Sequence, residues 1–311
     1  MGHLPLHRAP GRTVSGAVMT PWPPSIAFIG LGVMGHSMAG HLLDAGYPLV
    51  VHNRTASKGQ DLVDRGARWA SSPGEAARQA DITISIVGYP ADVEQVYLSP
   101  GGVVETARPG SLIIDMTTST PSLAQRIAQE AEKRGVFSLD APVSGGDVGA
   151  REAKLTIMVG GPDEAFQRAL PVFRVMGPTV TLMGGHGAGQ HAKMANQIAI
   201  AGTMLSVVES LAYAQRVGLD PAVVHSAISA GSAGSWSMSN YGPRILKGDF
   251  APGFYVKHFV KDLRIALEEA SARHLELPGL DLAKRLYERL AAEGGAELGT
   301  QALWTLYSAA E

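Results

Sequence analysis

One lysine in the second half of the sequence stands out, because it is almost alone in a long apolar segment. Between residues 190 and 214 the only formally charged side chains are Lys193 and Glu209. A helix that is apolar on nearly all faces is usually buried, and a lysine is seldom fully buried without a partner. Lys193, Asn196 and Gln197 are spaced i, i+3 and i+4, so on a helix they share one face. The pattern fits a reactive site at the mouth of a buried helix. It fits equally a lysine whose stem covers apolar surface while its ammonium reaches water.

A glycine pattern near the start of the sequence predicts a phosphate-binding turn. The apolar run 25–29 leads into Gly30-Leu31-Gly32-Val33-Met34-Gly35, and a helical segment and a second apolar run at 48–52 follow. This order is the setting in which G-x-G-x-x-G binds a dinucleotide. Gly30 permits a tight turn, Gly32 lets the backbone approach a pyrophosphate, and Gly35 allows close packing of helix on sheet. The helix start adds unpaired N–H groups and a positive dipole end. A purely structural turn is the alternative.

The residues after the second apolar run bear on the choice of dinucleotide. An acidic residue there binds the ribose 2′-hydroxyl of NAD, whereas an arginine suits the 2′-phosphate of NADP. The chain has Asn53-Arg54-Thr55 and no acid before Asp61. A guanidinium presents donors that match phosphate oxygens. We therefore expect Asn53, Arg54 and Thr55 to bind the cofactor, with NADP(H) preferred and NAD(H) possible. The alternative is an arginine that is simply solvated.

Four further apolar runs lie between residues 82 and 159 and alternate with helical segments. Repeated strand–helix units predict a parallel, doubly wound sheet. Ligands of such sheets sit outside the carboxyl ends of the strands. This rule places Gly88-Tyr89 and Thr117-Thr118 beside the cofactor.

Strand periodicity disappears from Gly189 onward, and helical segments follow, interrupted by a polar glycine-rich loop at 231–237. We predict an α/β fold with a Rossmann-type dinucleotide-binding domain at 25–187. An all-α domain at 188–311, for substrate binding and oligomerisation, is joined to it by the long buried helix. Residues 1–24 are rich in proline and show no helical or strand period, so we expect a disordered leader there.

A second glycine-rich segment follows the apolar run that ends at Asp140. In Asp140-Ala141-Pro142-Val143-Ser144-Gly145-Gly146, the two glycines leave backbone N–H groups uncovered and Ser144 adds a hydroxyl. Such donors at the sheet edge would suit a carboxylate. A tight turn into the next strand explains the glycines equally well.

Lys261 and Asp262 are adjacent in a helix predicted near 257–274. Neighbouring residues on a helix point in different directions, so these two do not make a simple i,i+4 pair, and taken alone they are expected at the surface. His258 precedes Asp262 by four residues, which favours an ion pair or a pocket wall. The histidines do not gather into a ligand set, and we assign no metal.

Composition narrows the function classes. The 311-residue chain has a formal net charge of -2, so it lacks the basic excess expected of a nucleic-acid-binding protein. The apolar run 198–208 contains Thr203 and Ser206 and is too short to cross a bilayer. The absence of cysteine excludes disulfides and thiol catalysis. With no secretory apolar stretch near the start, we expect a cytoplasmic protein without nucleic-acid or membrane partners.

Together these motifs resemble the β-hydroxyacid dehydrogenase family, which includes 3-hydroxyisobutyrate dehydrogenase and 2-hydroxy-3-oxopropionate reductase. The resemblance begins near Ile26 and extends to the C-terminus. It rests on four motifs in order: the turn at 30–35, the segment 140–146, Gly187-Ala188-Gly189-Gln190 with Lys193 and Asn196, and Lys261-Asp262-Leu263. The sequence departs from the family pattern at His41 and Gln197, where asparagine is frequent, and near Lys154, where glycine is common.

The resemblance implies a role for each matching residue. Lys193 would be the catalytic residue, and Ser144, Gly145 and Gly146 would hold the substrate carboxylate. Lys261 would reach the cofactor, and Asp262 would lie near the substrate. The positions that match the nicotinamide side are Val87, Gly88 and Thr118.

The implied activity is reversible hydride transfer between NADP(H) and a short 3-hydroxy acid or its semialdehyde. Lys193 would act as general acid and base, with a pKa lowered by burial, while Asn196 and Gln197 fix the ammonium or substrate oxygens. Alternatives are a reductase of 2-hydroxy-3-oxopropionate, glyoxylate or succinic semialdehyde, an imine-type reductase, or a non-catalytic dinucleotide-binding regulator. The expected partners are a small carboxylate substrate and further copies of the chain, in a homodimer or homotetramer.

Overall fold

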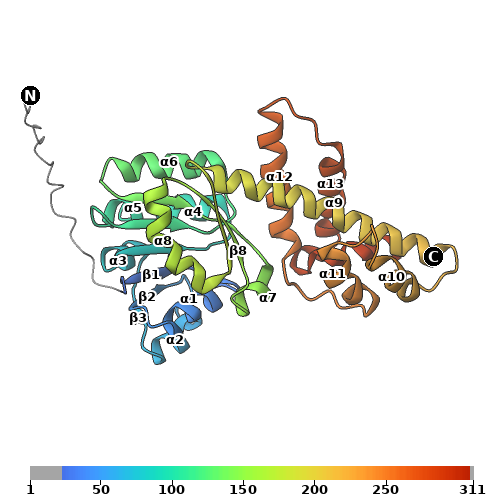
Figure 1. The fold of residues 1–311 in the computed structure, drawn as a ribbon, viewed down its shortest axis with the longest axis horizontal. Coiled ribbons are helices and arrows are strands. Elements are labelled where there is room, and N and C mark those ends of the chain that lie inside the picture. Colours follow the sequence, from blue (N-terminus) through green and yellow to red (C-terminus); the bar gives the residue numbers. More distant parts are fainter. Residues whose placement is uncertain (1–22, 309–311) are drawn as a thin grey trace, which may run out of the picture.

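The alternation of strands and helices in the first half builds one sheet, and the second half is helical (Figure 1). The structure is a computed structural model that describes residues 23–308. Of the leader expected at 1–24, only Pro23 and Pro24 lie within the described residues. The Rossmann-type sheet followed by helices confirms the predicted fold class.

The sheet follows the order β3-β2-β1-β4-β5-β6-β8-β7, with β9 paired to β8. Its strands are β1 Ile26–Ile29, β2 Leu49–His52, β3 Arg68–Trp69, β4 Ile82–Ser85, β5 Leu112–Asp115, β6 Phe137–Asp140, β7 Val143–Ser144, β8 Thr156–Gly160 and β9 Thr179–Gly184. Strands β1, β4 and β5 are buried along their whole length, as expected of strands covered on both faces.

The sheet is parallel from β3 to β6 and mixed beyond β6, where only the pair β8 and β9 is parallel among the described strands. β8 runs antiparallel to both β6 and β7, which corrects the expectation of a fully parallel sheet. A parallel connection needs a crossover of a dozen or more residues, usually a helix that covers the sheet. The chain between β7 and β8 holds only the short α7, Gly146–Arg151, so it reverses direction.

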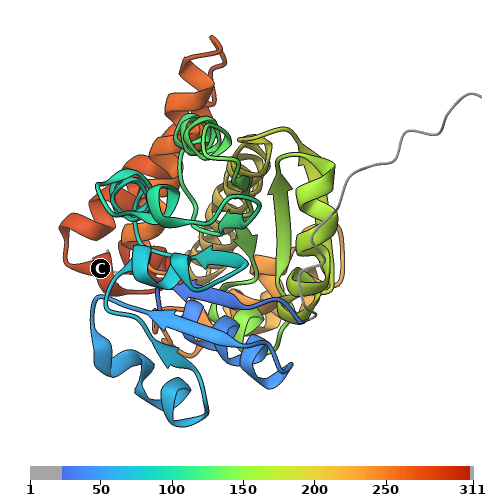
Figure 2. The same ribbon diagram turned by 90° about the vertical axis from the view of Figure 1, so that its left-hand side faces the viewer.

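Helices cover both faces of the sheet (Figure 2). Alternate residues of β1 face opposite sides: Ile26 and Phe28 belong to one apolar cluster, Ala27 and Ile29 to another. The first cluster includes residues of α1 and α8, and the second includes residues of α4 and α6. The helices of this half are α1 Gly35–Asp44, α2 Gln60–Asp64, α3 Pro73–Arg78, α4 Pro90–Leu98, α5 Val103–Thr106, α6 Pro121–Glu132, α7 and α8 Asp163–Met176, with the 3-10 helix η1 at Ala56–Gly59.

The long helix expected around Lys193 is α9, Ala188–Arg216, and it runs from the sheet into the helical half (Figure 1). By length and hydropathy alone α9 could cross a membrane, but it packs against β8, α11, α12 and α13 and half of its most apolar window is buried. Core helices of globular folds have these properties. The remaining elements are α10 Pro221–Ser229, α11 Trp236–Leu246, α12 Val256–Ser271, α13 Pro278–Ala292, η2 Gly295–Glu297, η3 Thr300–Trp304 and α14 Thr305–Ser308.

Candidate active site

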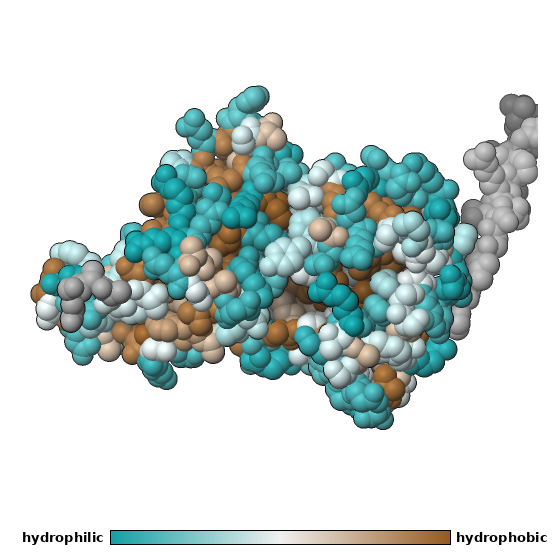
Figure 3. Space-filling view, turned by 180° about the vertical axis from the view of Figure 1, so that it is seen from behind, coloured by the Kyte–Doolittle hydropathy of each residue, from teal (hydrophilic) through white to brown (hydrophobic). Residues whose placement is uncertain are grey.

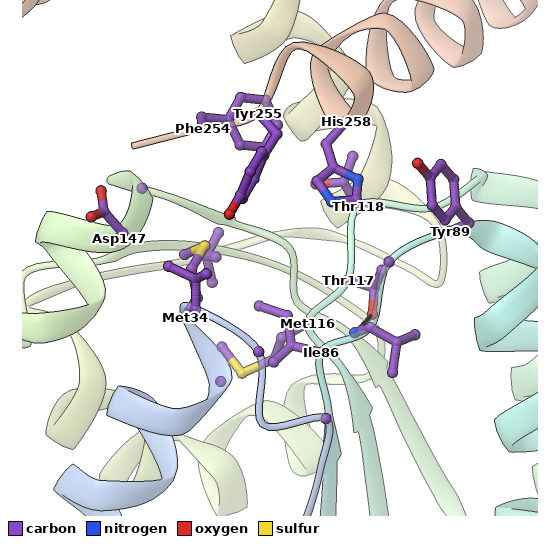
Figure 4. A pocket seen from close by; sticks show the side chains of 18 of the residues that line it. Met34, Ile86, Tyr89, Met116, Thr117, Thr118, Asp147, Phe254, Tyr255 and His258 are labelled. Atoms are coloured by element: carbon purple, nitrogen blue, oxygen red, sulfur yellow. Dashed lines mark hydrogen bonds between the residues drawn. The ribbon is translucent and has the colours of Figure 1, made fainter. Parts of the chain in front are cut away.

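A large cavity of about 1540 Å³ lies between the carboxyl ends of the strands and the helical half. It is lined by residues from the loops that follow the strands and from α9, α11 and α12. Figure 4 shows part of this lining. The predicted site residues that line it are Gly30, Gly32, Val33, Met34, Gly35, Asn53, Arg54, Thr55, Val87, Gly88, Thr118, Ser144, Gly145, Gly146, Lys193, Asn196, Gln197, Lys261 and Asp262. Leu31 does not line the cavity, because its side chain is buried in the core below the turn.

At two of the three glycines in the turn between β1 and α1 there is no room for a side chain. Gly30 has φ +95°, and a Cβ there would lie 2.1 Å from the carbonyl oxygen of Ile86. A Cβ on Gly35 would lie 2.0 Å from the carbonyl oxygen of Gly30. A Cβ on Gly32 would meet nothing within 4 Å, so its backbone faces open space in the cavity. This bare backbone at the start of α1 fits the phosphates of a dinucleotide.

Asn53 and Arg54 occupy the end of β2 in different ways. The Oδ1 of Asn53 accepts a hydrogen bond from the Leu31 N–H at 2.9 Å, which ties the β2 end to the glycine turn. The Arg54 side chain is 88% exposed and lies 3.5 Å from the Asp92 carboxylate. Arg54 is therefore an exposed cation at the cavity rim, and within residues 23–308 its one ion pair is the weak surface pair with Asp92.

The Ser-Gly-Gly segment forms the cavity wall beside α7. Ser144 ends β7, and the two glycines that follow have φ +132° and +62°. Residues other than glycine rarely adopt such φ angles. The carbonyl of Gly253, from the loop before α12, would be 3.4 Å from a Cβ on Gly146. The segment therefore lies where the two halves of the molecule meet.

The first turn of α9 is fixed to the sheet by buried polar groups. The Asp140 carboxylate, at the end of β6, accepts hydrogen bonds from the N–H groups of Gly187 at 2.7 Å and Gln190 at 2.9 Å. The Gln190 amide in turn accepts from Ser119 N–H and donates to the Thr117 carbonyl. Asp140 thus satisfies N–H groups that a helix start leaves unpaired. One turn later, Lys193 reaches the cavity from a rigid base.

Lys193 is 6% exposed, and its ammonium makes no hydrogen bond or ion pair with any residue in the range 23–308. Burial lowers its pKa from 10.5 to about 8, an effect that the Asp262 carboxylate opposes and the Lys261 ammonium reinforces. A group with this pKa is present in both protonation states near neutral pH. That is the property required of a general acid and base.

Asn196 and Gln197 are linked in a chain that leads to Asp262. The Asn196 amide donates to Gln197 Oε1 at 2.8 Å, and Gln197 Nε2 donates to Asp262 Oδ2 at 2.7 Å. Gln197 is 1% exposed, and Asp262 is fully buried. The side-chain amide of Gln197 is therefore already hydrogen-bonded to Asp262 and Asn196.

The expectation, from spacing alone, that Lys261 and Asp262 lie at the surface is wrong. Lys261 is 12% exposed and its Nζ lies 3.2 Å from Asp262 Oδ1. The same Nζ donates to the carbonyl of Thr118 at 2.6 Å and to that of Gly88 at 3.3 Å. Lys261 is held by the loops after β4 and β5, and Asp262 is held by Gln197 of α9, so both side chains are buried where the two halves meet. Helix spacing alone cannot anticipate this, since the loops belong to the other half of the molecule.

Several cavity residues were not predicted from the sequence. The segment expected as a loop up to Ser237 instead starts helix α11 at Trp236, which contributes Asn240, Tyr241 and Arg244 to the wall. The signal available was Ser235, whose hydroxyl accepts from the Met238 N–H as a helix cap. Gly242 and Pro243 inside the helix obscured the pattern.

Aromatic rings close the cavity where α12 begins. Figure 4 shows Phe254, Tyr255 and His258 projecting toward the sheet, opposite Met34 and Met116, with Tyr89 to one side. His258 lies 5.3 Å from Tyr89 and 5.9 Å from Tyr255, measured between ring centroids. Among the described residues no three His, Asp or Glu side chains gather as a metal site.

Two family models match the chain in sequence. The model of the NAD binding domain of 6-phosphogluconate dehydrogenase matches residues 25–185. The model described as NAD-binding of NADP-dependent 3-hydroxyisobutyrate dehydrogenase matches residues 187–307. The two matches meet just before α9.

Individual proteins are similar over nearly the whole chain. A protein of Arabidopsis thaliana named "probable 3-hydroxyisobutyrate dehydrogenase-like 1, mitochondrial" is 53% identical over 94% of this chain and 87% of its own. The 2-hydroxy-3-oxopropionate reductase of Escherichia coli is 38% identical over 89% of this chain and 95% of its own. The structure of Mycobacterium tuberculosis 3-hydroxyisobutyrate dehydrogenase with L-serine superposes with a TM-score of 0.84, at 30% identity, over 92% of this chain and 99% of its own.

Proposed function

This chain belongs to the 3-hydroxyisobutyrate dehydrogenase family, and from that premise we propose that it interconverts a short 3-hydroxy acid and its semialdehyde with NADP(H), using Lys193 as general acid and base. Family membership makes it an NAD(P)-binding oxidoreductase that acts on hydroxyl groups. The substrate, the preferred cofactor and the role of Lys193 are the proposed part.

The observation that carries the proposal is the buried ammonium of Lys193. It has a lowered pKa, no protein partner among residues 23–308, and a place in the same cavity as the glycine turn. A structural lysine would be expected to bury its stem and send its ammonium to water or to a carboxylate. An unpaired ammonium inside a ligand-sized cavity fits a group reserved for substrate.

Different segments around Lys193 would bind different parts of the cofactor and substrate. The glycine turn fits the pyrophosphate, and the backbone at Ser144, Gly145 and Gly146 would hold a substrate carboxylate. When bound, the nicotinamide accepts or supplies the hydride. In the oxidation direction neutral Lys193 takes the proton from the substrate hydroxyl. In the reduction direction its ammonium polarises the carbonyl oxygen and returns that proton. The helical half completes the cavity and shields these steps from water.

We propose NADP(H) as the preferred cofactor because of Arg54. Its guanidinium stands at the end of β2, where the adenosine ribose binds in folds of this type, and no acidic residue before Asp61 competes for the 2′-hydroxyl. The exposed ion pair of Arg54 with Asp92, at 3.5 Å, would be outcompeted by a 2′-phosphate carrying nearly two negative charges.

A spectrophotometric screen tests the function. Small 3-hydroxy acids, 2-hydroxy-3-oxopropionate, glyoxylate and succinic semialdehyde would be offered with NADP(H) and NAD(H), and absorbance followed at the nicotinamide band. Turnover of 3-hydroxyisobutyrate or a close analogue supports the proposal. Preference for 2-hydroxy-3-oxopropionate would favour the activity named for the Escherichia coli relative. If no compound gave a redox change, the result would favour a non-catalytic dinucleotide-binding regulator.

We also propose that copies of this chain associate. Apolar side chains are exposed at the end of the helical half that holds α10, where Figure 3 shows brown residues gathered. Exposed large apolar side chains on α10 and around the C-terminal end of α9 are Tyr213, Val217, Leu219 and Val223, of which Tyr213 is 69% and Val223 is 64% exposed. Apolar surface concentrated in this way marks interaction sites. Light scattering on Val223→Glu, compared with the unaltered chain, tests this end as the contact.

A further inference from the structure

His258 belongs to the cavity but to none of the roles described above. It sits in the first turn of α12, and its ring hangs over the loop after β4, with Cε1 3.8 Å from where a Cβ on Gly88 would be. Figure 4 shows the ring pointing from α12 toward Thr118, with Tyr89 alongside.

Neither ring nitrogen of His258 makes a hydrogen bond within residues 23–308. Nδ1 is buried and has no hydrogen-bond partner among the described residues, although most buried side-chain polar atoms in proteins have one. The ring is partly open to the cavity that it lines. Because a half-turn about Cβ–Cγ exchanges a nitrogen for a carbon without moving the ring, either edge can present a nitrogen to a ligand.

The charges around the ring favour its neutral form. Burial lowers the pKa of His258, and the ammonium groups of Lys261 and Lys257 lower it further, against weaker opposing effects of Asp262 and Glu297. A neutral imidazole offers one N–H donor and one acceptor. Such a group suits hydroxyl or amide partners better than phosphate.

The position of the ring identifies the part of the ligand that it faces. His258 and Lys261 are spaced i, i+3, and the Lys261 ammonium lies on the carbonyls of Gly88 and Thr118. These loops follow β4 and β5, on the far side of β1 from the β2 end that carries Arg54. A dinucleotide laid across the strand ends, with its adenosine at β2 and its pyrophosphate on the glycine turn, has its nicotinamide half at β4 and β5.

We propose that His258 is a cofactor-binding residue that hydrogen-bonds the nicotinamide riboside half of the dinucleotide from the helical side of the cavity. This inference rests on the proposed function, since it assumes that a nicotinamide dinucleotide occupies the cavity. The aromatic wall of Tyr89, Phe254 and Tyr255 holds the imidazole ring over that half.

Fluorescence titrations with two ligands isolate this contact. NADPH contains the nicotinamide riboside, and 2′,5′-ADP keeps the adenosine and the 2′-phosphate but lacks it. His258→Phe retains a ring in the aromatic wall and removes both nitrogens. His258→Gln retains a donor and an acceptor at similar reach. His274→Asn is the matched control, because it removes an exposed imidazole beyond the far end of α12, at φ +56°, which asparagine tolerates.

His258→Phe should weaken NADPH binding about tenfold, the loss expected for one hydrogen bond whose partner is left buried. His258→Gln should stay within about twofold of the unaltered chain, and His274→Asn should not differ from it. Binding of 2′,5′-ADP should be the same in all four proteins.

The inference is overturned if His258→Phe binds NADPH normally, or if it loses NADPH and 2′,5′-ADP to the same extent. Failure of the proposed function looks different, because the unaltered chain would then either bind neither NADPH nor NADH, or bind one of them and show no redox change in the substrate screen. If the unaltered chain prefers NADH, the same comparison is made with NADH and 5′-AMP.

Discussion

Two lysines, Lys193 on α9 and Lys261 on α12, reach the same cavity from different helices, and their surroundings differ in one respect. Lys261 is surrounded by oxygen atoms: two carbonyls of the sheet half and the Asp262 carboxylate. Lys193 is more deeply buried and touches none. The pKa of Lys193 falls to about 8 because burial desolvates its charge, and the Asp262 carboxylate offsets this effect only in part.

The difference separates two uses of a buried cation. A lysine held by oxygens on both sides of an interface joins the two halves, and its charge is stabilised in place. A buried lysine without oxygen partners carries an unfavourable charge, and in the proposed mechanism a substrate oxygen is the group that stabilises it. Asp262 affects both lysines: it forms an ion pair with Lys261, and its charge raises the pKa of Lys193 from a greater distance.

The largest effect is expected from Lys193→Ala. Removal of a general acid–base group should lower turnover by about 10²–10⁴-fold, while NADPH affinity stays nearly unchanged. Steady-state kinetics and a binding titration on the same preparation provide the check. Lys284→Ala, at a partly buried lysine of α13 that does not line the cavity, serves as a control for loss of a lysine. Full activity of Lys193→Ala would show that the catalytic assignment is wrong.

Lys261→Met should act mainly on stability. It removes charge-assisted hydrogen bonds to the Thr118 and Gly88 carbonyls and leaves Asp262 without its cation, so the free energy of unfolding should fall by about 1–3 kcal/mol. Chemical denaturation measures this change. If Lys193→Ala destabilised the protein more than Lys261→Met, the contrast between the two lysines would be reversed.

The pH dependence of activity should report the Lys193 pKa. In the oxidation direction the base must be neutral, so kcat/KM should rise with pH through about 8 and level off above it. In the reduction direction the ammonium is required, and kcat/KM should decline above about 8. Lys261→Met should move both midpoints upward and Asp262→Asn should move them downward, because the two charges act on Lys193 with opposite signs. Identical midpoints in all three proteins would exclude Lys193 as the titrating group.

The smallest effect is expected from Gln197→Asn. The shorter amide should no longer span the distance between Asn196 and Asp262, but the change leaves Lys193 and the substrate carboxylate site in place. We expect KM to change by a few-fold, about 1 kcal/mol or less, with kcat nearly constant. A loss of kcat comparable to that of Lys193→Ala would mean that Gln197 acts in the chemical step.

Much of the fold could be predicted because its signals are local. Short apolar runs flanked by glycine predicted most of the longer strands, and the glycine turn predicted the start of α1. The reversal at β7 and β8 could not be predicted in the same way, because Val143 and Ser144 are too few to show a strand period. Helix α11 was missed because Gly242 and Pro243 break the helical pattern, and its burial against α9 compensates for both.

The site was predictable to the extent that its residues form short motifs. Lys193, Asn196 and Gln197 share a helix face that spacing reveals. Lys261 is held by loops about 140 to 170 positions away in the chain, and Asp262 is held by Gln197 on another helix, so no local pattern indicates their burial. The aromatic wall around His258 depends on the same meeting of the two halves.

The attachment of α9 to the sheet has a consequence for engineering. Asp140 fixes the first turn of α9, and four residues further along its own loop begins the Ser-Gly-Gly segment. One stretch of backbone therefore sets both the base of the helix that carries Lys193 and the position of the proposed carboxylate site. Helical halves exchanged between relatives at a junction beyond Gln197 would inherit this geometry unchanged. Such chimeras would vary the far wall of the cavity, including Trp236 and Tyr241, while the reacting groups stay in register.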